Sequence, residues 1–190
     1  VLRQIFGTAY EHRREAWIRR LYELVVELDE RGVDVDALAG RPAFVTAVHD
    51  ASRIAMGEHI EEKLDMLKAV LFNAATHAPD EVSDLWTLRY LRWVDELEPQ
   101  HIAVLRFGLD PRGWLNEAGV DMPEFMSGPR SEVLKLARFP FPVEQMELIL
   151  EDLRAFRLGD VGSGMVTGRS MYDPWVTDRG RRFLEWLTVV

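Results

Sequence analysis

The placement of apolar residues between glycines and prolines constrains this chain most, because it divides the sequence into amphipathic helical segments. From Tyr10 to Arg31, apolar residues recur every three or four positions, which is the spacing of one helix face. These residues are Trp17, Leu21, Leu24, Val25 and Leu28. Gly32 follows them, and glycine commonly ends a helix in the left-handed conformation. We therefore predict a helix over 10–31.

Prolines begin or end the following segments up to residue 120. Pro42, Pro99 and Pro111 stand where a first helical residue is favoured, and Pro79 closes a segment. Between positions 42 and 77 the helical spacing slips across Gly57, so this segment is either one long helix or two helices that meet near Gly57. Together the segments predict an all-α fold with a multi-helix bundle over 1–120.

The last third of the chain has a different order of elements. Residues 120–130 contain two prolines and a glycine and are the best candidate for a linker. A short helix over 131–138 and a helix that begins at Pro142 follow. A glycine-rich hairpin, with strands near Val166 and Trp175, then precedes a closing helix over 178–187. This order predicts a winged-helix-like unit over 130–190 that carries a small two-stranded β-hairpin and packs with the bundle as one body.

Composition limits the classes of protein to which this chain can belong. The 190 residues are 47% hydrophobic, and a chain of this length buries about 70% of its unfolded surface, so a sizeable core is expected. The net charge of -9 makes the protein acidic and repels nucleic-acid backbones and anionic lipid at long range. The absence of cysteine excludes a disulfide scaffold, a thiolate nucleophile and a Cys-based zinc site.

The same composition predicts a cytoplasmic bacterial protein. Of the 23 basic residues, 20 are arginine, which is typical of GC-rich bacterial genes. No apolar run reaches the about 18 residues of a membrane span, and no signal-peptide pattern is present. The chain starts at Val1 rather than Met, so a segment before Val1, including a membrane anchor, stays open.

No motif indicates catalysis or cofactor binding. Gly162, Ser163 and Gly164 superficially resemble a phosphate-binding loop, but this segment follows a helix and contains no lysine. The five histidines are spread singly, and no Gly-x-Ser-x-Gly elbow occurs. We therefore assign no catalytic residue, no cofactor-binding residue and no cofactor, and a non-enzymatic function is favoured over an enzymatic one.

Glu58, His59 and Glu62 are the closest approach to a metal site in the sequence. Helical di-metal proteins use Glu-x-x-His steps on two helices that face inward, and no second pair of this kind exists. A solvated helix face with paired charges explains these residues better. We therefore assign no metal ligand, and a metal-dependent helical enzyme centred on these three residues is kept as an alternative.

The C-terminal unit has the element order of a winged-helix DNA-binding domain but not its charge. A winged helix holds DNA through basic residues of its recognition helix and its wing. Between Pro142 and Val190, six arginines stand against eight acidic residues. A transcription regulator, the second alternative, would gather its arginines on one face: Arg154, Arg157, Arg169, Arg179, Arg181 and Arg182. The acidic balance makes nucleic acid a disfavoured partner.

Trp86, Tyr90 and Trp93 follow each other at helical spacing. Such a stripe is usually part of a core, but aromatic side chains also dominate binding energy at protein interfaces. Long amphipathic helices with aromatic faces can in addition bury them against a second copy. We therefore take these three residues as the candidate interaction site and expect a protein partner or a homo-oligomer.

Several short stretches taken in order resemble a family of uncharacterised bacterial helical proteins. They are Arg13-Arg14-Glu15-Ala16-Trp17, Glu62-Lys63-Leu64-Asp65-Met66-Leu67, Leu71-Phe72-Asn73-Ala74-Ala75, Val94-Asp95-Glu96-Leu97 and Val176-Thr177-Asp178-Arg179-Gly180. The looser layout is similar to helical proteins linked to phage-abortive infection. The resemblance implies a helical layout and a bacterial origin, and it carries over no catalytic residue. The function expected from the sequence is a non-enzymatic protein-interaction or regulatory module, in stress response or phage defence.

Overall fold

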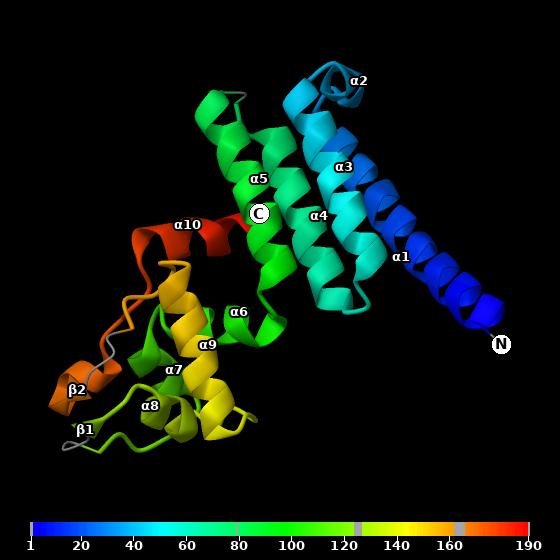
Figure 1. Cartoon of the computed structure of the whole chain (residues 1–190). Helices are drawn as coiled ribbons and strands as arrows, with labels where there is room; N and C mark the ends of the chain where they lie inside the picture. Colours follow the sequence, from blue (N-terminus) through cyan, green and yellow to red (C-terminus); the bar gives the residue numbers. More distant parts are fainter. Residues whose placement is uncertain (1, 79, 124–126, 162–165, 190) are drawn as a thin grey trace. The chain divides into compact units, whose positions relative to one another are not determined.

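A computed structural model describes residues 2–78, 80–123, 127–161 and 166–189 (Figure 1). The described residues form an all-α fold with ten α-helices and one pair of two-residue strands, which confirms the all-α, multi-helix part of the predicted fold class. The chain divides into two compact units, Val1–Glu98 with Trp186–Val190, and Pro99–Glu185. Among the described residues, no helix is both long and apolar enough to cross a membrane.

The first unit is built on four long helices and one short one. These are α1 (Leu2–Glu30), α2 (Val35–Ala39), α3 (Pro42–Gly57), α4 (Glu61–Thr76) and α5 (Glu81–Glu96). Helix α4 packs against α1, α3 and α5, and nine of its sixteen residues are buried. The centre of this core is formed by apolar side chains with almost no exposure: Leu28, Ala47, Leu67, Val70, Leu71 and Leu91.

The connection between α3 and α4 decides between the two alternatives for the segment 42–77. Helix α3 ends at Gly57, and α4 begins at Glu61, so the segment is two helices that meet near Gly57. The carboxylate of Glu58 accepts hydrogen bonds from the backbone N–H groups of His59 (2.7 Å) and Ile60 (3.0 Å). These bonds fix the backbone of the two residues that precede α4 and so hold the turn between the two helices.

Helix α1 is much longer than its neighbours. It has 29 residues against 16 in each of α3, α4 and α5, which corresponds to about 44 Å against about 24 Å. Its N-terminal end extends past the other helices of this unit (Figure 1). Gly7, Thr8 and Tyr10 to His12 are accordingly exposed.

The second unit consists of shorter helices around a separate core. Its elements are α6 (Pro99–Phe107), α7 (Pro111–Glu117), β1 (Ser127–Gly128), α8 (Ser131–Leu136), α9 (Val143–Ala155), β2 (Val166–Thr167), a 3-10 helix (Gly168–Tyr172) and α10 (Asp178–Trp186). Trp175 lies against two glycines of this core. A Cβ at Gly108 would lie 2.5 Å from its ring, and one at Gly159 would lie 2.7 Å from it, so only glycine allows this packing.

The boundary between the units differs from the sequence-based prediction. We predicted a bundle over 1–120 and a C-terminal unit over 130–190, whereas α6 and α7 belong with the C-terminal unit, which begins at Pro99. Helix α6 packs against α9, and the carbonyl of Gly108 accepts a hydrogen bond of 3.1 Å from the N–H of Trp175. The prolines and glycine of 120–130 mark a connection inside this unit instead of a linker between units.

The predicted winged-helix hairpin is not confirmed. Strand β2 pairs antiparallel with β1, with Ser127 opposite Thr167 and Gly128 opposite Val166. The second predicted strand, near Trp175, contributes only an isolated bridge between Val176 and Gly159. Between the two predicted strands the chain forms the 3-10 helix Gly168–Tyr172. Residues 162–165, on which the predicted glycine loop falls, lie outside the described residues.

Candidate functional site

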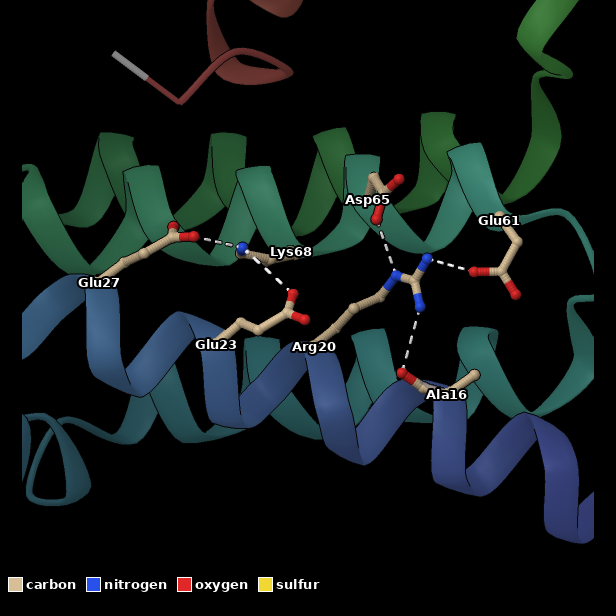
Figure 2. A network of polar contacts seen from close by, with 7 residues as sticks. All are labelled: Ala16, Arg20, Glu23, Glu27, Glu61, Asp65 and Lys68. Carbon is tan, nitrogen blue, oxygen red and sulfur yellow. Dashed lines mark hydrogen bonds and ion pairs between the residues drawn. The ribbon is translucent and has the colours of Figure 1, made fainter.

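Ion pairs attach one flank of α1 to α4 (Figure 2). Arg20 of α1 donates a hydrogen bond of 2.8 Å from Nε to Asp65 of α4, and its Nη2 pairs with Glu61. Lys68 of α4 pairs with Glu27 (2.5 Å) and Glu23 (3.6 Å) of α1. The two helices exchange charges in both directions, so this flank of α1 is polar and occupied.

Arg20 is the buried member of this network. Its side chain is 10% exposed, whereas those of Glu61 and Asp65 are 68% and 66% exposed. Burial alone would lower the pKa of Arg20, but its hydrogen bonds to Glu61 and Asp65 outweigh burial and raise the pKa. The guanidinium therefore stays charged while its stem packs in the helix interface.

The other flank of α1 borders an apolar groove of about 520 Å³ between α1, α2 and α3. We call this cavity the groove. Its lining residues are Leu21, Leu24, Val25, Leu28, Val35, Leu38, Ala39, Phe44, Val45, Val48 and His49. His49 is the only one with a polar side chain. The volume falls within the about 300–1,000 Å³ of binding cavities in proteins.

The short helix α2 closes one end of the groove. Gly32 takes a positive φ of 72° just after α1, which lets the chain leave the helix in the left-handed region. Asp34 then caps α2 by accepting a hydrogen bond of 3.0 Å from the N–H of Ala37. Pro42 begins α3 at a first helical position. These local signals turn the chain back within about ten residues, so that α2 presents Val35, Leu38 and Ala39 to the groove.

Exposed apolar side chains continue from the groove along α1. Ile18 is 49% exposed, Tyr22 71% and Val25 45%, and their spacing of four and three residues puts them on one helix face. We call these three residues the α1 stripe. Val45 of α3 is 49% exposed at the groove. A groove joined to a row of exposed apolar residues is typical of a surface that binds another protein.

The predicted aromatic site lies mostly in the core of the first unit. Tyr90 is 3% and Trp93 5% exposed, and the ring of Tyr90 lies 5.0 Å from that of Trp186. These two residues therefore offer no surface to a partner. Trp86 is half-buried and stacks on Tyr90 at 5.6 Å. The interaction role predicted for the three residues stays a prediction, and only Trp86 has the exposure that it requires.

The three metal candidates do not converge on one point, although Nδ1 of His59 lies 3.4 Å from Oε1 of Glu58. Glu58 is held in the turn between α3 and α4 by an ion pair of 3.0 Å with Lys63, and its side chain is 12% exposed. His59 is 82% exposed, and Glu62 lies exposed in the first turn of α4. In the part of the chain that the structure describes, no group of three or more His, Cys, Asp or Glu side chains could hold a metal ion.

Five of the six arginines of the DNA-binding alternative lie at or near the ends of α9 and α10, which meet in the second unit, and Arg169 lies in the 3-10 helix. Thr177 donates hydrogen bonds to the carbonyls of Arg157 (2.8 Å) and Leu158 (2.9 Å), which places the start of α10 next to the end of α9. Of the six arginines, Arg154, Arg157, Arg181 and Arg182 are exposed and Arg179 is half-buried. The side chain of Arg169 lies outside the described residues.

Sequence reasoning missed the groove and the α1 stripe. The predicted core face of α1 contained Leu21 and Val25, but Ile18 and Tyr22 were passed over. Their spacing with Val25 already formed a second apolar stripe beside the core face, and this was the available signal. A helix with two apolar stripes buries one in its own core and can offer the other to a partner.

Comparisons with protein-family models, with curated proteins and with solved structures found no match. The functional argument therefore depends on the geometry of the chain itself. The groove offers apolar contact and a single imidazole, with no nucleophile or carboxylate in its lining. This lining is suited to binding an apolar surface.

Proposed function

We propose that this chain is a non-enzymatic protein-interaction module of a bacterial protein, which binds a partner helix at the groove and the α1 stripe. The observation that carries the proposal is the continuity of the apolar groove with exposed Ile18, Tyr22 and Val25. A regulatory role in stress response or phage defence remains part of the proposal.

The dimensions of the surface fit an amphipathic helix. From Ile18 to Leu28, α1 covers about 15 Å, which is the length of two to three turns of a bound helix. Helix-in-groove recognition uses apolar anchors at positions i, i+3 or i+4, and i+7. Tyr22 is the most exposed of the three stripe residues, and tyrosine is among the side chains that most often dominate binding energy.

Site-specific photocrosslinking tests this function. A photoreactive amino acid placed at Val45, at the groove, is expected to form adducts with a partner protein in host cells. The matched control is the same amino acid at Leu148, which is 60% exposed on α9, in the second unit. Mass spectrometry of the crosslinked peptides should identify an amphipathic helix at position 45 and not at position 148. Equal adducts at both positions, or none at position 45, would contradict the proposal.

A winged-helix DNA-binding function is the second candidate. It is favoured by the meeting of the α9 and α10 ends, which carry four exposed arginines. It is opposed by Glu144, Glu147, Glu151 and Asp152 on α9, which would face phosphates. DNA binding at low ionic strength that weakens steeply with salt would support this candidate, and its absence in filter binding would reject it.

A further inference from the structure

The exposed face of α1 carries opposite charges at the two ends of the α1 stripe. Arg14 lies four residues before Ile18, and Asp29 lies four residues after Val25, so both continue the same helix face. Both side chains are exposed. Salt bridges among the described residues involve neither of them. Next to the stripe, the face therefore carries a positive charge before Ile18, with exposed Glu11 one turn further out, and a negative charge after Val25.

We propose that the partner helix is α1 of a second copy of this chain, held in an antiparallel contact around a twofold axis. The proposal rests on the proposed function, because it identifies the helix that the stripe and the groove receive. A twofold axis between Leu21 and Tyr22 sets Ile18 opposite Val25 of the second copy. The same axis sets Arg14 opposite Asp29 of the second copy and brings the two Tyr22 rings together at the centre.

The order of charges selects the antiparallel orientation. In a parallel pair, Arg14 would face Arg14 and Asp29 would face Asp29, and like charges across an interface are unfavourable. In the antiparallel pair, both charged contacts join an arginine to an aspartate. Each pair lies at the rim and adds specificity more than affinity. An isologous contact of this kind is the commonest form of oligomer interface.

The exposed apolar area suits a small contact that dissociates on dilution. The apolar residues exposed on this face and beside the groove are Ile18, Tyr22, Val25 and Val45. Together they expose on the order of 400 Å² in each copy, since one aromatic side chain alone can bury 150–250 Å². A twofold contact would bury about twice this area, which is the size of a weak, reversible interface.

The length of α1 fits the same arrangement. Its N-terminal turns expose Gly7, Thr8 and Tyr10 to His12, and a helical segment of fewer than about 12–15 residues is only marginally stable in water without packing. The proposed register carries these turns past residue 30 of the second copy, toward the α2 end of its groove. The N-terminal turns of α1, which extend past the other helices of the first unit, thereby gain a neighbour.

Analytical ultracentrifugation of the whole chain tests the proposal. We expect a dimer at about 100 μM that dissociates on dilution to about 1 μM or below. Tyr22→Asp should weaken dimerisation at least about 30-fold, the effect of losing a central aromatic anchor. Leu148→Asp is the matched control and should leave the dimer unchanged. Because Tyr22 is 71% exposed, circular dichroism should show an unchanged helical fold.

A charge-reversal cycle tests the register. Arg14→Asp and Asp29→Arg each replace two attractive contacts by two repulsive ones and should weaken the dimer about tenfold. The double variant restores opposite charges and should recover most of the wild-type affinity. A wild-type chain that is monomeric at about 100 μM, a dimer insensitive to Tyr22→Asp, or a double variant without recovery would each overturn the proposal.

The two proposals fail in different ways. A monomeric chain whose position 45 still crosslinks to a helix of another protein overturns the homodimer and supports the interaction module. A monomeric chain without crosslinks at position 45 overturns both. Crosslinks from position 45 to residues 2–30 of a second copy support both.

Discussion

The guanidinium of Arg20 in α1 donates a hydrogen bond of 2.8 Å to the carboxylate of Asp65 in α4, from a side chain that is only 10% exposed. The acceptor is largely solvated and the donor is not. Loss of the arginine therefore removes both a charged hydrogen bond and the packing of its stem, whereas the freed carboxylates return to water.

We expect Arg20→Ala to lower the free energy of unfolding by about 1–3 kcal/mol, since it removes a charged hydrogen bond and buried stem contacts. Urea denaturation followed by circular dichroism measures this change. Arg92→Ala, at an exposed position on α5, is the control and should change stability by less than about 0.5 kcal/mol. An equal effect of both substitutions would show that the α1–α4 network contributes nothing specific.

Substitution of Lys63 should lower the stability of the fold more than substitution of a surface lysine. Its side chain is 3% exposed, and its Nζ donates a hydrogen bond of 2.9 Å to the carbonyl of Asp95 and pairs with Glu58 at 3.0 Å. Lys63→Met removes this hydrogen bond and leaves the nearly buried carboxylate of Glu58 without its cation, which should cost about 2–4 kcal/mol. The control is Lys135→Met, because the side chain of Lys135 is 40% exposed. Thermal unfolding measures the melting temperatures of both variants. Similar melting temperatures for the two variants would contradict this account.

Acidification should destabilise the first unit through Glu58. Burial of Glu58 acts to raise its pKa, but hydrogen bonds from Lys63 and from the N–H groups of His59 and Ile60 outweigh burial, so the pKa is lowered from 4.5. A carboxyl whose pKa is lower in the folded state stabilises the fold above the unfolded pKa. This stabilisation is lost as the pH falls from about 4.5 through the folded pKa.

The Glu58→Gln variant tests this dependence. It should be less stable than the wild type at pH 7, and the difference should shrink as the pH falls through the lowered folded pKa, where the wild-type carboxyl also becomes neutral. Chemical denaturation at a series of pH values measures both curves. Parallel curves over the whole range would assign the acid sensitivity to other carboxylates.

Gly180 is required for the packing of α10 in the second unit. A Cβ at this position would lie 2.2 Å from the carbonyl oxygen of Leu158 and 2.8 Å from Val176. Gly180→Ala should therefore cost about 1–3 kcal/mol, since backbone has to move. Gly57→Ala, with no atom within 4 Å of the added Cβ, is the control and should be close to neutral. Differential scanning calorimetry of both variants distinguishes a steric effect from a general effect of removing glycine.

The helices could be predicted because their signals are local. The spacing of Trp17, Leu24 and Leu28 predicted α1, the slip at Gly57 predicted the alternative of two helices, and Pro111 predicted the start of α7. Each of these signals acts within one or two helical turns, through side-chain periodicity, capping and the restricted φ of proline. A sequence therefore displays them without knowledge of any distant contact.

Which of these elements pack together depends on contacts between residues far apart in the chain. Tyr90 became a core residue because Trp186 packs on it, and Val166 paired with Gly128 instead of with the segment near Trp175. The unit boundary moved to Pro99 because Trp175 fits against Gly108. Burial depends on which faces meet, and periodicity along one helix does not contain that information.

The same division applies to the candidate site. The sequence by itself determined that α1 has apolar residues at 18, 22 and 25 and opposite charges at 14 and 29. Only the tertiary structure decided that α4 covers one flank of α1 through Arg20 and Lys68, while the other flank borders an open groove. The physical reason is that α1 has more apolar and charged surface than its own bundle covers, and helix packing selects the flank that stays exposed.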